Sequence, residues 1–264
     1  MTEPSGSLGG ERIVVVGDSP LVTELAKALE GAGGEVRPFI VRHADLAARP
    51  ARPVAGLGEA LREATLGIDI TTGPAIEKRA VVRQIDEMLP DRAYLLAFAL
   101  PVSATEIASW CRQPERVCGF GFIPPFGATK LVELAGATQT GDAAREVAER
   151  VFGALDRETA RVGDGVGLVA ARVLTSIINE AAYALMTGIA SAQDIDAAVR
   201  LGVNYPHGPL EWADLIGIDL VFAIIKGMHD ETGDDRYRPA PVLRQMVLAG
   251  HTGRMAGRGF FDYS

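Results

Sequence analysis

The sequence contains few of the residues that build disulfide frameworks and metal centres. Its 264 residues include two cysteines, Cys111 and Cys118, and four histidines. Two cysteines form neither a disulfide framework nor, by themselves, a tetrahedral zinc site. The histidines are His43, His207, His229 and His251. None of them has the short spacing that is typical of metal ligands on one element, so we expect no metal centre.

Positive charge and long apolar runs are also scarce. Lys and Arg number 26 against 34 Asp and Glu, which gives a formal net charge of −8. An acidic chain without a basic cluster is a poor partner for nucleic acid. No apolar run approaches the roughly 20 residues that cross a bilayer. Residues 1–10 are small and polar, without the parts of a secretory signal. We therefore expect a cytoplasmic protein that binds neither nucleic acid nor membrane.

What the chain does contain is typical of a folded protein with a sizeable core. Hydrophobic residues make up 48% of it and charged residues 23%, which excludes wholesale disorder. At about 150 residues per domain, the length predicts one large domain or two modest ones.

The N-terminal half alternates strands with helices. A β-branched run, Ile13–Val16, ends at Gly17, as a buried parallel strand does. Ser19 and Pro20 have the pattern of an N-cap and first residue of a helix that ends near Glu30. Further strands are expected near Val36–Val41, Leu66–Thr71, Tyr94–Leu100 and Val117–Ile123, and further helices at Ala75–Met88 and Thr105–Cys111. This alternation predicts a parallel sheet covered on both faces, with the strand order left open.

From about Val166 the pattern becomes entirely helical. Val166–Ile189 is long, apolar and rich in Ala and Leu, and Ser191 with Asp194 resembles an N-terminal cap of the next helix. Later helical stretches are expected near Leu210–Leu215, Leu220–Asp230 and Pro241–Ala249. The apolar content exceeds what about 100 residues bury among themselves, which favours a homodimer through this half. The alternative is a well-filled monomeric bundle.

Spaced motifs in the helical half carry a family likeness. They include Asn179-Glu180-Ala181, Ala190–Asp196, Gly208-Pro209-Leu210, Asp214–Asp219 and Gly257–Tyr263. In the first half, Ala104–Ala108, Pro114–Val117 and Lys130–Glu133 agree in order. Together they resemble the NAD-dependent L-3-hydroxyacyl-CoA dehydrogenase family. The resemblance implies an α/β, Rossmann-like domain followed by an all-α dimerisation domain. We place a flexible tail at 1–10, the Rossmann-like domain at 11–165 and the helical domain at 166–264.

The resemblance also locates the catalytic positions, and most of them have changed. Members of the family use a His as base, a Glu that orients it, and Ser and Asn near the substrate oxygen. Here the His position holds Gly121, the Ser position Leu100 and the Asn position Ala171, and only the Glu is kept, as Glu133. A glycine has no side chain to accept a proton. Glu133 is therefore the one candidate catalytic residue, with a buried structural carboxylate as its alternative interpretation.

The positions that would hold NAD, the cofactor implied by the resemblance, have changed as well. Of the three fingerprint glycines Gly17 remains, while Ser19 and Val22 stand at the second and third. Asp18 adds negative charge where phosphates bind. The acid that holds the adenosine ribose would fall near Ile40 and is absent. Gly73 stands where the family has a Glu, whereas Lys78 is retained. The candidate cofactor residues are thus Gly17, Ser19 and Lys78.

Two basic features of the first half remain open. Arg42 is positioned either as a partner for a 2′-phosphate or as an ordinary surface residue. The loop Arg49–Pro53 is shorter than the family's helical excursion and is either a trimmed connection or a weak phosphate contact.

Two functions follow from these residues. The family resemblance implies an NAD-dependent oxidoreductase that acts on a 3-hydroxyacyl-CoA. The loss of polar residues at the catalytic and cofactor positions favours the alternative, a catalytically inactive dimeric homologue. Such a homologue would act as a binding or assembly subunit, with an acyl-CoA-type molecule as its possible ligand.

Overall fold

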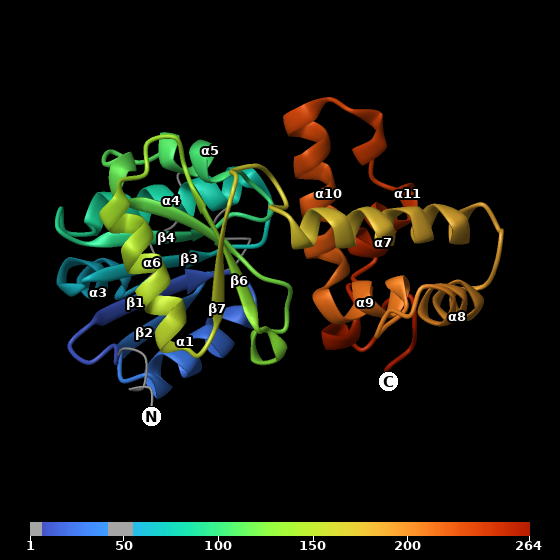
Figure 1. Ribbon diagram of the computed structural model, residues 1–264, viewed down its shortest axis with the longest axis horizontal. Coiled ribbons are helices and arrows are strands. Elements are labelled where there is room, and N and C mark those ends of the chain that lie inside the picture. The colour runs from blue at the N-terminus through green and yellow to red at the C-terminus, as the bar shows by residue number, and fades with distance from the viewer. Residues whose placement is uncertain (1–6, 42–54) are drawn as a thin grey trace. The chain divides into compact units, whose positions relative to one another are not determined.

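The computed structural model describes residues 7–41 and 55–264, and these form two compact units (Figure 1). The first unit comprises the described residues up to Phe122 together with Phe126–Leu168; the second comprises Ile123–Pro125 and Val169–Ser264. The chain passes from the first unit to the second between Leu168 and Val169, a few residues after the predicted boundary at 165/166. Arg42 and the loop Arg49–Pro53 lie outside the described residues. Within those residues, no helix is long and apolar enough to span a membrane, and no three His, Cys, Asp or Glu side chains are grouped to hold a metal ion.

The first unit is a seven-stranded sheet with helices on both faces (Figure 1). Its strands are β1 (Arg12–Gly17), β2 (Glu35–Ile40), β3 (Leu66–Ile70), β4 (Tyr94–Phe98), β5 (Val117–Gly121), β6 (Leu131–Gly136) and β7 (Glu158–Val162). Its α-helices are α1 (Leu21–Gly31), α3 (Leu57–Glu63), α4 (Ala75–Met88), α5 (Ala104–Ser109) and α6 (Asp142–Ala154). The sheet confirms the predicted α/β class.

The strand order places a topological switch point between β1 and β3. The order is β2-β1-β3-β4-β5-β6-β7, and every neighbouring pair is parallel except β5 and β6. From β1 the chain goes to β2 on one side, and β3 lies on the other side. Ligands of open α/β sheets bind at such a switch point, outside the carboxyl ends of the strands. The loops after β1 and β3 therefore border the candidate cofactor site.

Buried β-branched and aromatic side chains form the core of this unit. The β1 residues Ile13–Val16 are at most 2% exposed, as a central strand with both faces covered requires. Near the carboxyl ends of β4 and β5, Phe98 lies 5.4 Å from Phe122 between ring centroids, and Phe122 lies 4.9 Å from Phe126. All three rings are buried.

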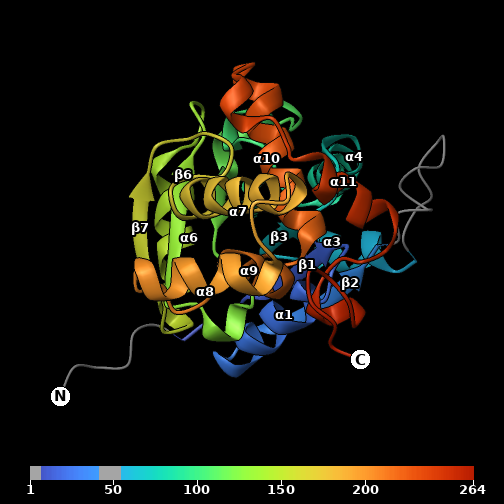
Figure 2. The same ribbon diagram turned by 90° about the vertical axis from the view of Figure 1, so that its right-hand side faces the viewer.

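The second unit is all-helical, as predicted (Figure 2). Its helices are α7 (Ala170–Met186), α8 (Ala192–Gly202), α9 (Pro209–Ile216), α10 (Ile218–Thr232) and α11 (Pro241–Leu248). Helix α7 packs against α9 and α10. The predicted cap of α8 is confirmed, since Ser191 Oγ accepts a hydrogen bond from Asp194 N at 3.2 Å.

Two buried carboxylates of this unit accept hydrogen bonds from backbone N–H groups. Asp196 accepts from Leu210 N and Glu211 N, and Asp214 from Phe260 N and Phe261 N, each at 2.8–2.9 Å. Burial raises the pKa of both Asp196 and Asp214, while these hydrogen bonds act in the opposite direction.

Three details of the first unit differ from the sequence predictions. Residues 7–10 were expected in a flexible tail, but Leu8 is fully buried and its N–H donates to Ala32 O. Ser19 was expected as an N-cap, but Pro20 occupies that position, without a side-chain cap, and α1 begins at Leu21. The elements α3, β6, α6 and β7 were not predicted from the sequence.

Candidate functional site

Gly121 ends β5 in a space that other side chains already fill. A Cβ atom added at Gly121 would lie 2.5 Å from Leu100 Cδ2 and 2.7 Å from Leu168 Cδ1. Carbon atoms normally make contact at about 3.5–4.0 Å. Leu100 and Leu168 are 1% and 4% exposed, so neither side chain extends into solvent. The position that the resemblance assigns to a catalytic His therefore has no room for even a methyl group in this packing.

The backbone of Leu168 is held in a conformation that leucine rarely adopts. Its φ is 47°, in the left-handed region. Two hydrogen bonds fix this turn: Gly167 N donates to Leu100 O at 2.9 Å, and Leu168 N donates to Gly165 O at 3.1 Å. The turn thus ties Leu168 to the segment that carries Leu100, and both leucines are held against Gly121.

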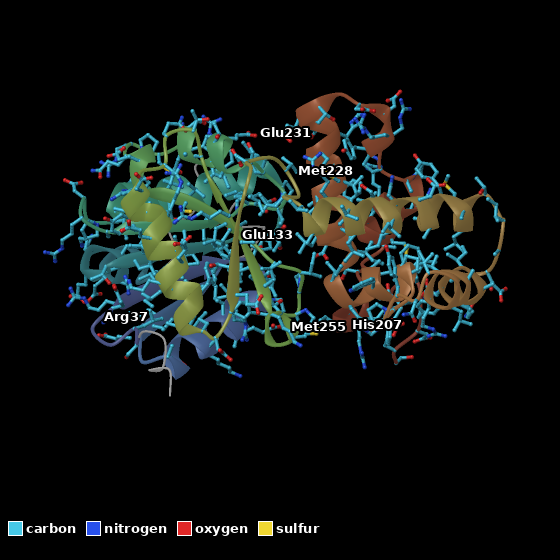
Figure 3. All side chains as sticks on the ribbon, in the orientation of Figure 1. Arg37, Glu133, His207, Met228, Glu231 and Met255 are labelled. Carbon is cyan, nitrogen blue, oxygen red and sulfur yellow. The ribbon has the colours of Figure 1, made fainter. Side chains whose placement is uncertain are left out.

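Glu133 lies on the strand next to Gly121. It is labelled in Figure 3, in the first unit. It is paired with Gly121 across the antiparallel β5–β6 ladder and is 4% exposed. The positions that the resemblance assigns to the Glu and the His, Glu133 and Gly121, are therefore direct cross-strand neighbours. Ala171, at the position that the resemblance assigns to the Asn, is buried in α7 of the second unit.

Asp18 bridges the two loops that follow β1 and β3 at the switch point. Its Oδ1 accepts hydrogen bonds from Thr72 N at 2.8 Å and Thr72 Oγ1 at 2.9 Å. Its Oδ2 accepts from Gly73 N at 2.8 Å. Asp18 follows β1, whereas Thr72 and Gly73 follow β3. A carboxylate of the protein thus uses the donors of the β3 loop, the loop in which the resemblance expects a Glu. Sequence reasoning found the charge of Asp18 but not this bridge.

The other candidate cofactor residues have structural contacts of their own. A Cβ atom at Gly17 would lie 2.7 Å from Ile70 O and 2.8 Å from Val22 Cγ2, so this glycine permits close packing of β1 against β3 and α1. Lys78 is fully buried; its ammonium pairs with Asp69 and donates to Thr71 O at 3.1 Å. Burial raises the pKa of Asp69, and the Lys78 charge opposes that rise.

Two further positions at this edge lack the groups of a dinucleotide site. Ser19 Oγ is buried and finds no hydrogen-bond partner among the residues that the structure describes. Ile40, which is paired with Gly17 at the end of β2, is 57% exposed where an acid for the ribose is expected. At these positions the chain therefore has neither the glycine pattern nor the acidic residue that hold a dinucleotide in this fold.

The backbone donors at the start of α5, after β4, also bind a carboxylate of the chain. Asp164 accepts from Ala104 N and Thr105 N, both at 2.8 Å, at the first residues of α5. A helix N-terminus favours negative charge, and here the chain supplies it. This capping residue was not identified from the sequence, because Asp164 lies 60 residues beyond Ala104.

The parallel-dominated sheet with its switch point is the architecture of a Rossmann-like domain, and an all-helical unit follows it in the chain. Residues 167–263 match the family model of the 3-hydroxyacyl-CoA dehydrogenase C-terminal domain, and residues 44–165 match that of the 3-hydroxyacyl-CoA dehydrogenase NAD-binding domain. The chain belongs to the 3-hydroxyacyl-CoA dehydrogenase family, whose members are oxidoreductases, and NAD is the cofactor that this membership implies. The second match begins after β1, α1 and β2, the elements around the glycine loop.

Individual relatives agree with this assignment. A probable 3-hydroxybutyryl-CoA dehydrogenase of Bacillus subtilis is 37% identical over 190 residues, which cover 70% of this chain and 65% of that protein. The 3-hydroxybutyryl-CoA dehydrogenase of Mycobacterium tuberculosis is 30% identical over 96% of this chain and 98% of its own. The crystal structure of (S)-3-hydroxybutyryl-CoA dehydrogenase from Ralstonia eutropha, 28% identical, superimposes with a TM-score of 0.73 over 97% of this chain and all of that chain.

Proposed function

We propose that this chain retains the family fold without the family's hydride-transfer chemistry, and that it acts as a dimeric binding or assembly subunit. The observation that carries the proposal is the packing at Gly121. Leu100 and Leu168 occupy the space beside the position where the family's base is expected, and both are buried.

The chemistry of the reaction explains why this packing matters. A general base must reach the substrate hydroxyl to within about 3 Å, and its contribution is typically 10²–10⁴-fold. The substrate oxygen also needs hydrogen-bond donors in the transition state. Gly121, Leu100 and Ala171 supply neither a base nor a side-chain donor. A binding role asks for the fold and its surfaces, but not for these groups.

A second candidate function is a family oxidoreductase in which Glu133 replaces the missing base. Its support is the direct pairing of Glu133 with Gly121 across β5 and β6. In that case Glu133, or a water that it holds, would accept the proton.

The test is NADH oxidation with acetoacetyl-CoA by the purified protein, compared with its Glu133→Gln variant. The proposal expects no turnover above background from either protein. It also expects that Gly121→His alone gives no turnover, because Leu100 and Leu168 fill the space that the imidazole would need. Turnover by the unmodified protein that Glu133→Gln abolishes would establish Glu133 as a working base and refute the proposal.

The proposed assembly is a homodimer formed mainly by residues beyond Val166. Its support is a set of large apolar side chains that are more than half exposed in the second unit: Val169, Val173, Ile189, Leu201, Val203, Leu248 and Met255. Light scattering at micromolar concentration is expected to give twice the chain mass. Val173→Asp and Ile189→Asp are expected to lower that mass, and Ile76→Asp, at an exposed apolar site of the first unit, serves as control. A monomeric unmodified protein would contradict this assembly.

An acyl-CoA-type molecule is the proposed ligand, because the curated relatives are named for 3-hydroxybutyryl-CoA. Calorimetric titration with acetoacetyl-CoA in the absence of nucleotide tests this separately from catalysis. Saturable heat is expected, and its absence up to millimolar ligand would remove this ligand class.

A further inference from the structure

At the switch point between β1 and β3, a carboxylate lies at the edge of the sheet where this fold binds its ligands. Asp18 takes up both backbone N–H groups of Thr72 and Gly73, together with the Thr72 hydroxyl. These contacts join loops that are 54 residues apart in the chain. A ligand that bound across the switch point would have to break this bridge or pass around it.

The Asp18 carboxylate is negatively charged, as is the pyrophosphate of a dinucleotide. A pyrophosphate binds at the switch point because backbone N–H groups and a helix N-terminus present positive potential. Asp18 lies in the loop that leads into α1, between Gly17 and the first helical turn. Its carboxylate places a negative charge before that helix N-terminus and accepts hydrogen bonds from the backbone donors of the neighbouring loop. An incoming phosphate therefore meets repulsion in place of hydrogen bonds.

We infer that Asp18 is the specificity-determining residue that excludes nicotinamide dinucleotides from the switch point, because it places a negative charge before the N-terminus of α1 and occupies the donors of the β3 loop. The inference concerns cofactor binding alone and does not rest on the chemistry at Gly121. A chain that binds NADH but does not turn over would overturn this inference and leave the proposed function standing.

The surrounding residues reinforce the effect of Asp18 without replacing it. Lys78, the retained cation of this edge, is fully buried and paired with Asp69, so it does not offset the Asp18 charge at the surface. Exposed Ile40 offers no acceptor for a ribose. Removing Asp18 is therefore expected to restore part of a dinucleotide site, with modest final affinity.

The experiment measures NADH binding by fluorescence and calorimetry in the absence of substrate. The unmodified protein is expected to show no saturation up to millimolar NADH. Asp18→Gly, which removes the carboxylate and frees both backbone donors, is expected to tighten binding at least tenfold. Asp18→Asn removes the charge but keeps one acceptor, so a smaller gain is expected. It also provides the test if the glycine variant does not fold. Circular dichroism and melting curves establish that each variant is folded.

Asp142→Asn is the matched control, because it removes the same charge from a side chain that is 95% exposed at the start of α6. It is expected to bind NADH as poorly as the unmodified protein. Micromolar NADH affinity of the unmodified protein would overturn the inference. Folded Asp18 variants that bind no better than the unmodified protein would overturn it as well, as would an equal gain in Asp142→Asn.

Discussion

Gly121→Ala is the substitution that most directly tests how tightly the space beside Gly121 is packed. The new methyl would lie 2.5 Å from Leu100 Cδ2 and 2.7 Å from Leu168 Cδ1, about 1 Å inside normal contact. Leu168 cannot move freely, because its left-handed turn is hydrogen-bonded to Leu100 O through Gly167 N. Overpacking of this kind costs about 1–3 kcal/mol, and we expect Gly121→Ala to lower the free energy of unfolding by that amount.

The same packing predicts how Gly121→Ala combines with Leu100→Ala. Leu100 is 1% exposed, so its truncation alone is expected to cost about 2–5 kcal/mol through the cavity it leaves. In the double variant the methyl at 121 enters part of that cavity. The double variant should therefore lose less stability than the sum of the two single losses, and the difference, the coupling energy, should be about 0.5–3 kcal/mol.

Urea unfolding followed by tryptophan fluorescence measures these energies. The chain has two tryptophans, Trp110 at the end of α5 and Trp212 in α9. A Trp212→Phe background therefore makes the signal specific for the first unit. Gly127→Ala is the control, since a Cβ there meets nothing within 4 Å, and it should change stability by less than about 0.5 kcal/mol. If Gly121→Ala behaves like this control, or if its loss and that of Leu100→Ala are additive, the space beside Gly121 is not filled as described.

Three further predictions concern other side chains of the two units. Lys78→Met leaves the fully buried Asp69 without its cation and should cost about 3–5 kcal/mol in urea unfolding, whereas the exposed Lys226→Met should cost far less. Ser191→Ala removes the N-cap of α8 and should cost about 1 kcal/mol, measured on the Trp212 signal. Burial raises the pKa of the Cys118 thiol to about 11 and that of Cys111 to about 12, so both stay protonated at pH 8 and should react with a thiol reagent much faster after unfolding. Because these folded-state values exceed the unfolded value of about 8.5, stability should fall as the pH rises above about 8.5; equal thiol reactivity before and after unfolding would contradict this burial.

Local patterns in the sequence were sufficient for the class of fold and the family. A β-branched run that ends at a glycine, helices with 3.6-residue periodicity, and a serine cap at Ser191 depend mainly on neighbours within a few residues. Spaced motifs of the helical half carried the family likeness, and the matches to both domain models agree with it. The sequence also identified Gly121 and Leu100 as residues that cannot perform acid–base chemistry, because that follows from residue type alone.

The tertiary structure decided what those residues do instead. The bridge from Asp18 to Thr72 and Gly73 depends on β1 and β3 being neighbours, and strand order is not written in any local pattern. The filling of the space at Gly121 depends on Leu168, 47 residues further along the chain and held by a turn with positive φ. Ser19 shows that a local pattern can also mislead. Serine is a residue type that often caps helices, yet α1 begins after Pro20. Propensity describes what a residue does beside its sequence neighbours, whereas packing across the sheet determines which groups meet in the folded chain.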